Sequence, residues 1–296
     1  MSPQIKKEKV VAKEQETLED SHGPEEYDPG LYTYSRLVDT VDGFGSVGDA
    51  EVEQFHRNGF LAIQNAYSQD QVSDALEAIA QLTGDSSSEV RVVQFERGLK
   101  EQVQEADGEA RELLVRKLTR FVGHDPRLDV FGEDLQLLDI LSRIMGEPAK
   151  LFANQAMLKP PGIGREKPWH QDHAYFNLPM GTCIVSAWVA LDKADPENGC
   201  MHVIPASHQD GPVVHFKRRD WQICDTDIAR NRVEAVALEP GGVLFWHGRL
   251  HHGSPANRSD RRRRALQLHF VPESVETIET EERLAVYGSE GKDVTC

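Results

Sequence analysis

The sequence predicts an α+β fold in which helices precede an antiparallel β barrel or sandwich. Three segments with helical periodicity lie before residue 148, and from Leu151 onward short β-branched and aromatic runs alternate with Gly, Pro and Asn. Helices followed by many strands are typical of α+β domains rather than of alternating α/β units. The length of 296 residues suits one large domain, since β barrels of ~200–250 residues are ordinary.

Three helices are expected before the strands. The first begins at Ser68, because Ser68 and Gln71 form a capping-box pair, and it ends at Gly84. Apolar residues at helical spacing predict two more helices, over residues 110–122 and 135–145.

The strands of the second half are read from composition and turn signals. Strands are predicted at residues 184–191, 243–246 and 265–271. The turn signal at residues 198–199 predicts that residues 201–204 return as the hairpin partner of the first of these strands.

Charge and hydropathy divide the chain into three parts. Residues 1–48 are rich in charged residues without apolar periodicity, which predicts a disordered acidic tail. Residues 49–273 form the expected domain, with a helical part at 49–148 and a β core at 149–273, and residues 274–296 form a C-terminal extension.

Composition excludes several classes of partner. The formal net charge is −16, which disfavours binding to nucleic acid or to an anionic membrane. No apolar run approaches the ~20 residues that a membrane helix needs, and no apolar signal segment is present near residue 1. We therefore expect a cytoplasmic protein that acts on a small molecule; the oligomeric state stays open.

The most informative motif is His170-Gln171-Asp172, followed 80 residues later by His252. Residues i and i+2 of an extended strand share a face, so His170 and Asp172 can reach one metal ion, and a neighbouring strand can supply a second imidazole. Two imidazoles and one carboxylate on one face of an octahedral ion are the ligands of non-haem Fe(II) oxygenases.

Spacing alone leaves the third ligand open. His251 and His252 are adjacent and face opposite ways on a strand, and His247 is a third candidate. The alternative is that His170 and Asp172 are surface loop residues.

An Fe(II) oxygenase with a two-electron substrate needs a further source of electrons, and 2-oxoglutarate can supply them while chelating the metal beside O2. Its distal carboxylate calls for an arginine. Residues 261–264 are four arginines before the last strand, and alternation puts Arg263 on one face with Gln267 and His269. The alternative is a solvated basic run.

Four ordered motifs now resemble the phytanoyl-CoA dioxygenase family, over roughly residues 50 to 272. They are Trp-His-Gln-Asp-His-Ala-Tyr-Phe at 169–176, Ser-Ala-Trp-Val-Ala at 186–190, Glu-Asn-Gly-Cys to Ile-Pro-Ala-Ser-His at 197–208, and His-Gly-Ser at 252–254 with Asn257 and Arg263. The family consists of Fe(II)/2-oxoglutarate oxygenases. The resemblance implies a double-stranded β-helix core (jelly-roll, cupin-like) with N-terminal helices packed on one side.

The resemblance also assigns site residues. The distal metal ligand of the family stands directly before Gly-Ser, which selects His252 to act with His170 and Asp172. For 2-oxoglutarate the resemblance implies five contacts: Arg263 and Ser254 at the distal carboxylate, Trp188, Gln155, and Lys117 with Arg116 as its alternative.

The expected activity is an Fe(II)- and 2-oxoglutarate-dependent dioxygenase that consumes O2. It hydroxylates an aliphatic carbon of a small organic molecule and releases succinate and CO2. Desaturation, epoxidation and ring formation use the same site and stay open. The alternatives are a non-catalytic small-molecule or metal-binding protein of the same fold and a cupin-like metal hydrolase or isomerase.

Overall fold

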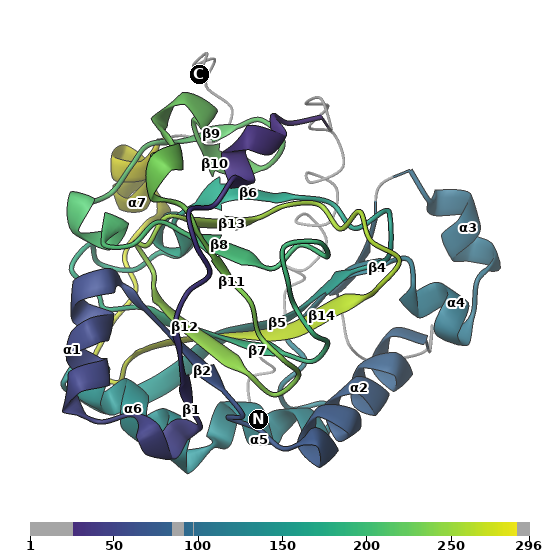
Figure 1. Ribbon diagram of the computed structural model, residues 1–296, viewed down its shortest axis with the longest axis horizontal. Coiled ribbons are helices and arrows are strands. Elements are labelled where there is room, and N and C mark those ends of the chain that lie inside the picture. The colour runs from purple at the N-terminus through teal and green to yellow at the C-terminus, as the bar shows by residue number, and fades with distance from the viewer. Residues whose placement is uncertain (1–25, 85–91, 97, 289–296) are drawn as a thin grey trace, which may run out of the picture.

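Two sheets face one another in the computed structural model, which describes residues 26–84, 92–96 and 98–288 (Figure 1). All neighbours in the large sheet are antiparallel except β1 and β2. In spatial order its strands are β1 (Thr40–Asp42), β2 (Phe60–Gln64), β12 (Val243–His247), β7 (Val185–Ala190), β14 (Arg263–Pro272), β5 (Ala149–Lys159), β4 (Val115–Thr119) and β3 (Val92–Phe95).

The small sheet lies across from the large one. Its strands, in spatial order, are β11 (Glu234–Val236), β8 (Met201–Val203), β13 (His252–Ser254) and β6 (Lys167–His170). One apolar cluster joins side chains of both sheets, including Trp188 and Trp246 from the large sheet and Val203 from the small one. This arrangement is the double-stranded β-helix, so the predicted fold class is confirmed.

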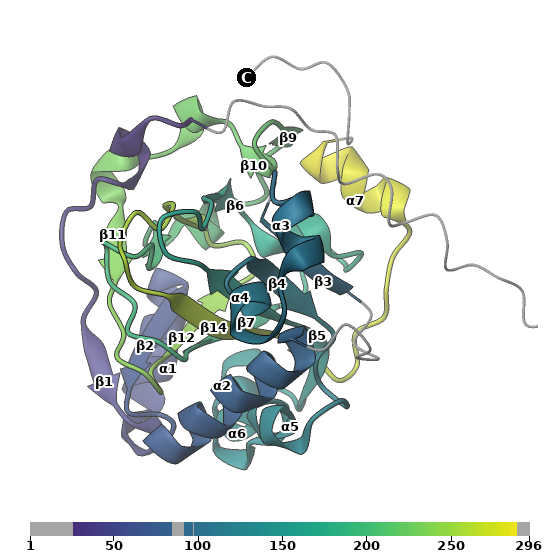
Figure 2. The same ribbon diagram turned by 90° about the vertical axis from the view of Figure 1, so that its right-hand side faces the viewer.

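Helices cover the outer face of the large sheet (Figure 2). They are α1 (Asp49–Asn58), α2 (Gln69–Gly84), α5 (Pro126–Glu133) and α6 (Leu135–Met145). The remaining elements are α3 (Lys100–Glu105), α4 (Gly108–Glu112), α7 (Thr280–Tyr287), the hairpin of β9 (His215–Lys217) and β10 (Trp221–Ile223), and the short 3-10 turns η1 (Pro29–Tyr32), η2 (Phe44–Ser46), η3 (Asp172–Tyr175), η4 (Ser207–Asp210), η5 (Asp225–Asp227) and η6 (Arg230–Arg232).

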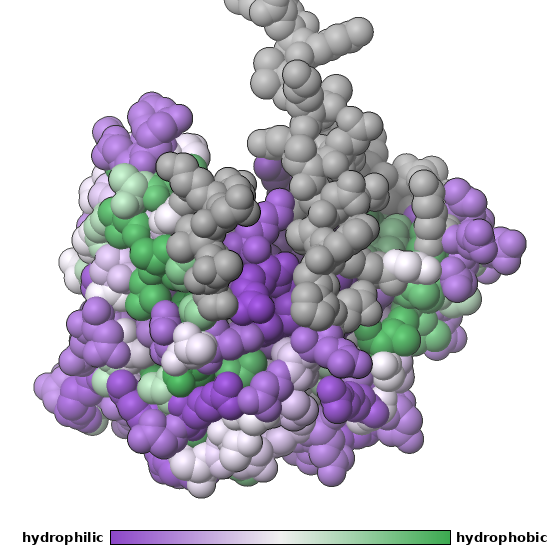
Figure 3. Space-filling view, turned by 90° about the horizontal axis from the view of Figure 1, so that it is seen from above, coloured by the Kyte–Doolittle hydropathy of each residue, from purple (hydrophilic) through white to green (hydrophobic). Residues whose placement is uncertain are grey.

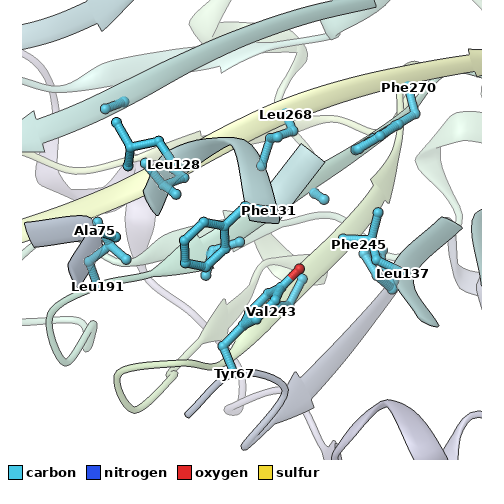
Figure 4. Close-up of a cluster of buried hydrophobic side chains, with 14 of the residues drawn as sticks. Tyr67, Ala75, Leu128, Phe131, Leu137, Leu191, Val243, Phe245, Leu268 and Phe270 are labelled. Atoms are coloured by element: carbon cyan, nitrogen blue, oxygen red, sulfur yellow. The ribbon is translucent and has the colours of Figure 1, made fainter. Parts of the chain in front are cut away.

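The period of two along each strand separates an apolar outer face from a functional inner face. On β14, Leu268 and Phe270 point outward into the main core, a cluster that also contains Phe131 of α5 (Figure 4). The alternate residues of β14 carry the side chains Arg263 and His269, which are buried on the other face. The helices therefore fix the sheet from outside, and the site is built inside.

Two of the three predicted helices are confirmed, and one is wrong. Ser68 and Gln71 cap α2 reciprocally, with N···O distances of 3.2 and 3.0 Å, and residues 135–145 form α6. Residues 110–122 instead contain the end of α4 followed by strand β4. Here β3 and β5 pair with β4 on its two sides, so sheet pairing overrides the helical pattern.

The predicted hairpin at residues 198–199 is also wrong. Gly199 has φ +84°, as a tight turn requires, but β7 and β8 belong to different sheets. The turn therefore carries the chain across the barrel.

The N-terminal segment predicted as a tail is described only in part. Its first 25 residues lie outside the described part of the chain. Residues 26–48 contain η1, β1 and η2, with Leu31 buried beside Trp169 of β6. The indole of Trp169 donates a hydrogen bond to the carbonyl of Leu31 at 3.2 Å.

Candidate metal centre and cosubstrate site

His170, Asp172 and His252 meet inside the barrel. β6 and β13 pair with His170 directly opposite His252, which sets their ring centroids 4.2 Å apart. Asp172 lies just beyond β6, at the start of η3 rather than on the strand. One ligand atom from each of the three lies within 4.8 Å of the other two.

Both imidazoles are oriented in the same way. Nδ1 of His170 lies 2.8 Å from the carbonyl of Pro168, and Nδ1 of His252 lies 2.9 Å from that of Leu250. Each carbonyl accepts the Nδ1 proton, so both Nε2 atoms carry lone pairs. Nε2 of His252 is buried and has no hydrogen-bond partner among the described residues, and a bound metal ion would coordinate its lone pair.

Among the described residues, the carboxylate of Asp172 accepts hydrogen bonds through one of its two oxygens. Its Oδ2 accepts hydrogen bonds from the Ser186 hydroxyl at 2.7 Å and from the Trp246 indole at 2.8 Å. Ser186 in turn lies 2.8 Å from Nδ1 of His269. Oδ1 is left facing the Nε2 atoms of His170 and His252, at 3.4 and 3.5 Å. Sequence reasoning missed these supporting residues, although strand alternation put all three on the inner face.

The pKa values of two buried histidines at the site are lowered, which favours binding of a divalent cation. Burial and the neighbouring His252 lower the pKa of His170 to about 4, and burial lowers the pKa of His269 to about 4. Both rings are therefore neutral at pH 7, and for His170, a candidate ligand, neutrality is what metal ligation requires. The donor set fits Fe(II).

The turn between the two motif ligands is anchored by Gln171. Its amide donates to the carbonyls of Gly211 and Arg249 at 2.9 and 2.7 Å and accepts from the backbone N–H of Val213 at 2.8 Å. The side chain of Gln171 is fully buried, so the central residue of the motif fixes the turn.

The competing histidines lie elsewhere. The ring of His247 lies against that of His208 in a tilted arrangement, with centroids 5.1 Å apart. His251 directly precedes β13 and is buried, and burial lowers its pKa to about 4. Among the described residues, only His252 joins His170 and Asp172.

Arg263 differs from its three arginine neighbours. Arg261, Arg262 and Arg264 each form an ion pair with an acidic side chain, namely Asp195, Glu112 and Asp192 respectively, at 2.8–2.9 Å. The side chain of Arg263 is 1% exposed, and within the described chain its one hydrogen bond goes to the carbonyl of Met157 at 3.3 Å. A buried guanidinium without an anion fits a carboxylate ligand.

The other expected cosubstrate contacts share this inner face. The Trp188 ring lies 5.4 Å below the guanidinium of Arg263. Gln155 of β5 and Trp188 of β7 both pair with Gln267 of β14, one on each side. Ser254 ends β13, two residues after His252.

Lys117 lies on β4 opposite Met157 of β5, not on a helix. Burial, helped by the charge of Lys167, lowers the pKa of Lys117 to about 8. Its neighbour Arg116 donates to the carbonyl of Glu166 at 3.0 Å, whereas no hydrogen bond of Lys117 is found in the described part of the chain. Lys117 is thus the freer of the two candidate cations.

The surface of the molecule is mixed. In Figure 3, strongly hydrophilic side chains gather in a strip down the middle of the face, with smaller apolar patches to either side. No helix within residues 26–84, 92–96 and 98–288 has the length and apolar character needed to cross a bilayer.

The fold and the buried triad define an oxygenase of the iron- and 2-oxoglutarate-dependent class. The family model for phytanoyl-CoA dioxygenase (PhyH) matches residues 55–265, and the chain belongs to this family. A probable phytanoyl-CoA dioxygenase of Caenorhabditis elegans is 28% identical over 77% of this chain and 76% of its own length. Phytanoyl-CoA dioxygenase 1 of rice, Oryza sativa subsp. japonica, is 28% identical over 77% of this chain and 90% of its own length.

Solved structures share the fold. EvdO2 of Micromonospora carbonacea var. aurantiaca, complexed with 2-oxoglutarate, has a TM-score of 0.63 at 23% identity, covering 82% of this chain and 98% of EvdO2. The α-ketoglutarate-dependent carbocyclase SnoK of nogalamycin biosynthesis has a TM-score of 0.63 at 19% identity, covering 84% of this chain and 96% of SnoK.

Proposed function

We propose that the chain hydroxylates an aliphatic carbon of a small organic molecule, and that His170, Asp172 and His252 hold its iron. The observation that carries the proposal is the buried triad together with Arg263, a buried cation that pairs with no acidic side chain in the described part of the chain. The reaction consumes substrate, O2 and 2-oxoglutarate. One oxygen atom enters the substrate as a hydroxyl group, the other enters succinate, and the 2-oxo acid loses CO2.

The residues of the inner face have different proposed roles in binding the metal and 2-oxoglutarate. When bound, Fe(II) and 2-oxoglutarate supply the electrons that reduce O2. Ser186 and Trp246 hold Asp172 so that a single oxygen faces the metal position, which leaves room for other ligands. Arg263 and Ser254 bind the distal carboxylate. Trp188, Gln155 and Lys117 line the remainder of the cosubstrate position.

The substrate approaches beside His170. The ring of Tyr175 lies edge-on to His170, with centroids 5.5 Å apart. Nζ of Lys167 is 3.0 Å from the hydroxyl of Tyr175 and 2.7 Å from a carboxylate oxygen of Asp220. An aromatic wall with both charges at its edge suits a small organic molecule that carries polar groups.

The cytoplasmic location expected from the sequence stays a prediction.

The proposal is tested by anaerobic titration of the apoprotein with Fe(II) and then 2-oxoglutarate, followed by the visible charge-transfer absorption of the chelate. We expect the band in the wild type, its loss in His252→Ala and its weakening in Arg263→Met. Each variant has a matched control, because His251 is the neighbouring buried imidazole and Arg264 the neighbouring arginine. His251→Ala and Arg264→Met should both retain the band.

Substrate-independent turnover of 2-oxoglutarate to succinate under air is the second readout. A folded wild-type protein that binds Fe(II) but gives neither the band nor succinate would contradict the oxygenase. Metal binding alone would then favour a binding protein, and O2-independent hydrolysis or isomerisation would favour the other alternative enzyme.

A further inference from the structure

Lys159 is a buried lysine that the proposed function leaves without a role. It ends β5, the strand beside β14, and its side chain is 4% exposed. Its Cα pairs with that of Arg263 on β14. Directly opposed residues of antiparallel strands have Cβ atoms about 4.5–5.5 Å apart, so Lys159 lies next to the guanidinium proposed to bind 2-oxoglutarate.

The ammonium group of Lys159 is fixed on the end of β13. It donates a 2.8 Å hydrogen bond to the hydroxyl of Ser254 and a 3.1 Å bond to the carbonyl of Ser254. A third bond goes to the carbonyl of Pro255. Because Lys159 donates to the hydroxyl oxygen, the hydrogen of Ser254 remains available for a further acceptor.

No acidic side chain within the described chain pairs with Lys159. All three of its bonds go to uncharged oxygens. Burial and the nearby Arg263 hold the pKa of Lys159 well below its usual value. Like charges directly opposed across two strands destabilise a sheet, and burial without an anion adds to that cost. An anion bound beside Lys159 and Arg263 would reduce both the repulsion between the two charges and the cost of burying them.

Two glycines pack closely against Lys159. A Cβ atom at Gly164 would lie 2.8 Å from Cα of Lys159, and one at Gly199 would lie 3.2 Å from its Cδ and 3.3 Å from its Nζ. The two glycines therefore let the chain close tightly over the lysine. Such enclosure holds the ammonium group at one place.

We propose that Lys159 is a positioning residue of the cosubstrate site, which orients the Ser254 hydroxyl and acts with Arg263 to select a 2-oxo acid with a second carboxylate. This inference rests on the proposed function. Arg263 supplies the direct contact, and Lys159 supplies a second positive charge behind the serine. Together they explain why two cations are buried side by side.

The test compares two ligands that differ only at the distal end. 2-Oxopentanoate keeps the 1-carboxylate and the 2-oxo group of 2-oxoglutarate and ends in a methyl group. The dissociation constants of both acids are measured anaerobically by calorimetry on Fe(II)-loaded full-length protein. Lys159→Met should weaken 2-oxoglutarate about 10- to 100-fold, the effect of losing a charge-assisted hydrogen bond, and leave 2-oxopentanoate within about twofold.

A matched control is present on the same strand. Lys150 also donates to two backbone carbonyls, those of Glu273 and Val275, at 2.7 and 3.2 Å. Lys150→Met should change neither dissociation constant. Lys159→Gln keeps a donor for the carbonyls while removing the charge, so it provides a second variant if Lys159→Met folds poorly.

Two results would overturn the inference. Equal weakening of both acids would show that Lys159 only supports the fold, and unchanged binding of both would show that its charge does not reach the ligand. The double variant with Arg263→Met supplies a further check, since residues acting on one carboxylate give non-additive losses. If the wild type bound neither acid, both this inference and the proposed function would fall.

Discussion

At the residue scale, each proposed ligand atom is left free because another atom of the same side chain forms the hydrogen bonds. Nδ1 of each imidazole is hydrogen-bonded to the carbonyl two residues earlier. Oδ2 of Asp172 accepts hydrogen bonds from Ser186 and Trp246. The three remaining atoms then face one point. This division makes the support of Asp172 testable apart from the ligands themselves.

Ser186→Ala should weaken Fe(II) binding about tenfold or more, the usual cost of removing a group that orients a ligand. Trp246 still holds the same carboxylate oxygen, so the loss should stay smaller than in Asp172→Ala. Metal affinity is measured by anaerobic competition with a chelator. Ser142→Ala, which removes a hydroxyl bonded within α6 at 2.7 Å from the carbonyl of Leu138, is the control and should leave the affinity unchanged.

Binding of 2-oxoglutarate should depend on pH through Lys117. Its pKa is about 8 in the free protein, and a bound carboxylate favours the ammonium form and raises that pKa. Affinity should therefore be highest below pH 8 and fall as the pH rises from 8 toward the pKa of the complex. Lys117→Met should flatten this part of the profile. If Lys117→Met left the pH profile unchanged, Lys117 would not contact 2-oxoglutarate. The control is Lys193→Met, which replaces an exposed lysine and should leave the profile as in the wild type.

The residues differ in how far the sequence predicts them. The spacing of the motif indicates which side chains can meet, and the structure brings His170, Asp172 and His252 together. The choice among three histidines needed the family resemblance, because spacing alone allows each. The support from Ser186, Trp246 and His269 comes from three strands distant in sequence, so local patterns could not reveal it. Their assigned roles remain predictions.

At the element scale, the helix predicted from a capping pair is present, whereas apolar periodicity alone predicted one helix correctly, α6, and one wrongly. α2 begins where Ser68 and Gln71 satisfy the free backbone groups of the first turn. The false helix over residues 110–122 has no such pair, and its second half becomes β4 because two neighbouring strands are available. Propensity is a weak local signal, and pairing partners far along the chain override it.

Ser68→Ala should therefore destabilise the protein by about 1 kcal/mol, the typical value of a lost N-cap. Ser73 lies exposed within the same helix, and Ser73→Ala should be neutral or slightly stabilising because alanine favours helices. Urea unfolding followed by circular dichroism measures both. Equal effects at the two positions would contradict a specific role for the cap.

At the scale of the whole molecule, the order of strands in space could not be read from the order in sequence. β7 and β8 are consecutive in sequence yet lie in opposite sheets. β6 and β13, which carry the two histidines, are neighbours only because the chain returns after some 80 residues. The family resemblance supplied this topology; turn signals alone predicted a hairpin in its place.

Ligands that join the two sheets should stabilise the whole molecule. Fe(II) and 2-oxoglutarate at about 100 times their dissociation constants add about 2.7 kcal/mol each, which raises Tm by about 5–10 °C per ligand for a domain of this size. The shift is measured by anaerobic calorimetry. His252→Ala should abolish it and His251→Ala should retain it; a shift that survives in His252→Ala would place the ligands elsewhere.

Strand β14 packs against the helices with one row of side chains and lines the site with the other. A saturation scan at residues of both rows would therefore return two phenotypes, one for each row. Substitutions at Leu266, Leu268 and Phe270 would reduce the amount of soluble protein, while those at Arg263 and Gln267 would leave the yield and change ligand affinity. Along this strand, mutations that change the amount of folded protein and mutations that change ligand binding therefore fall on different residues.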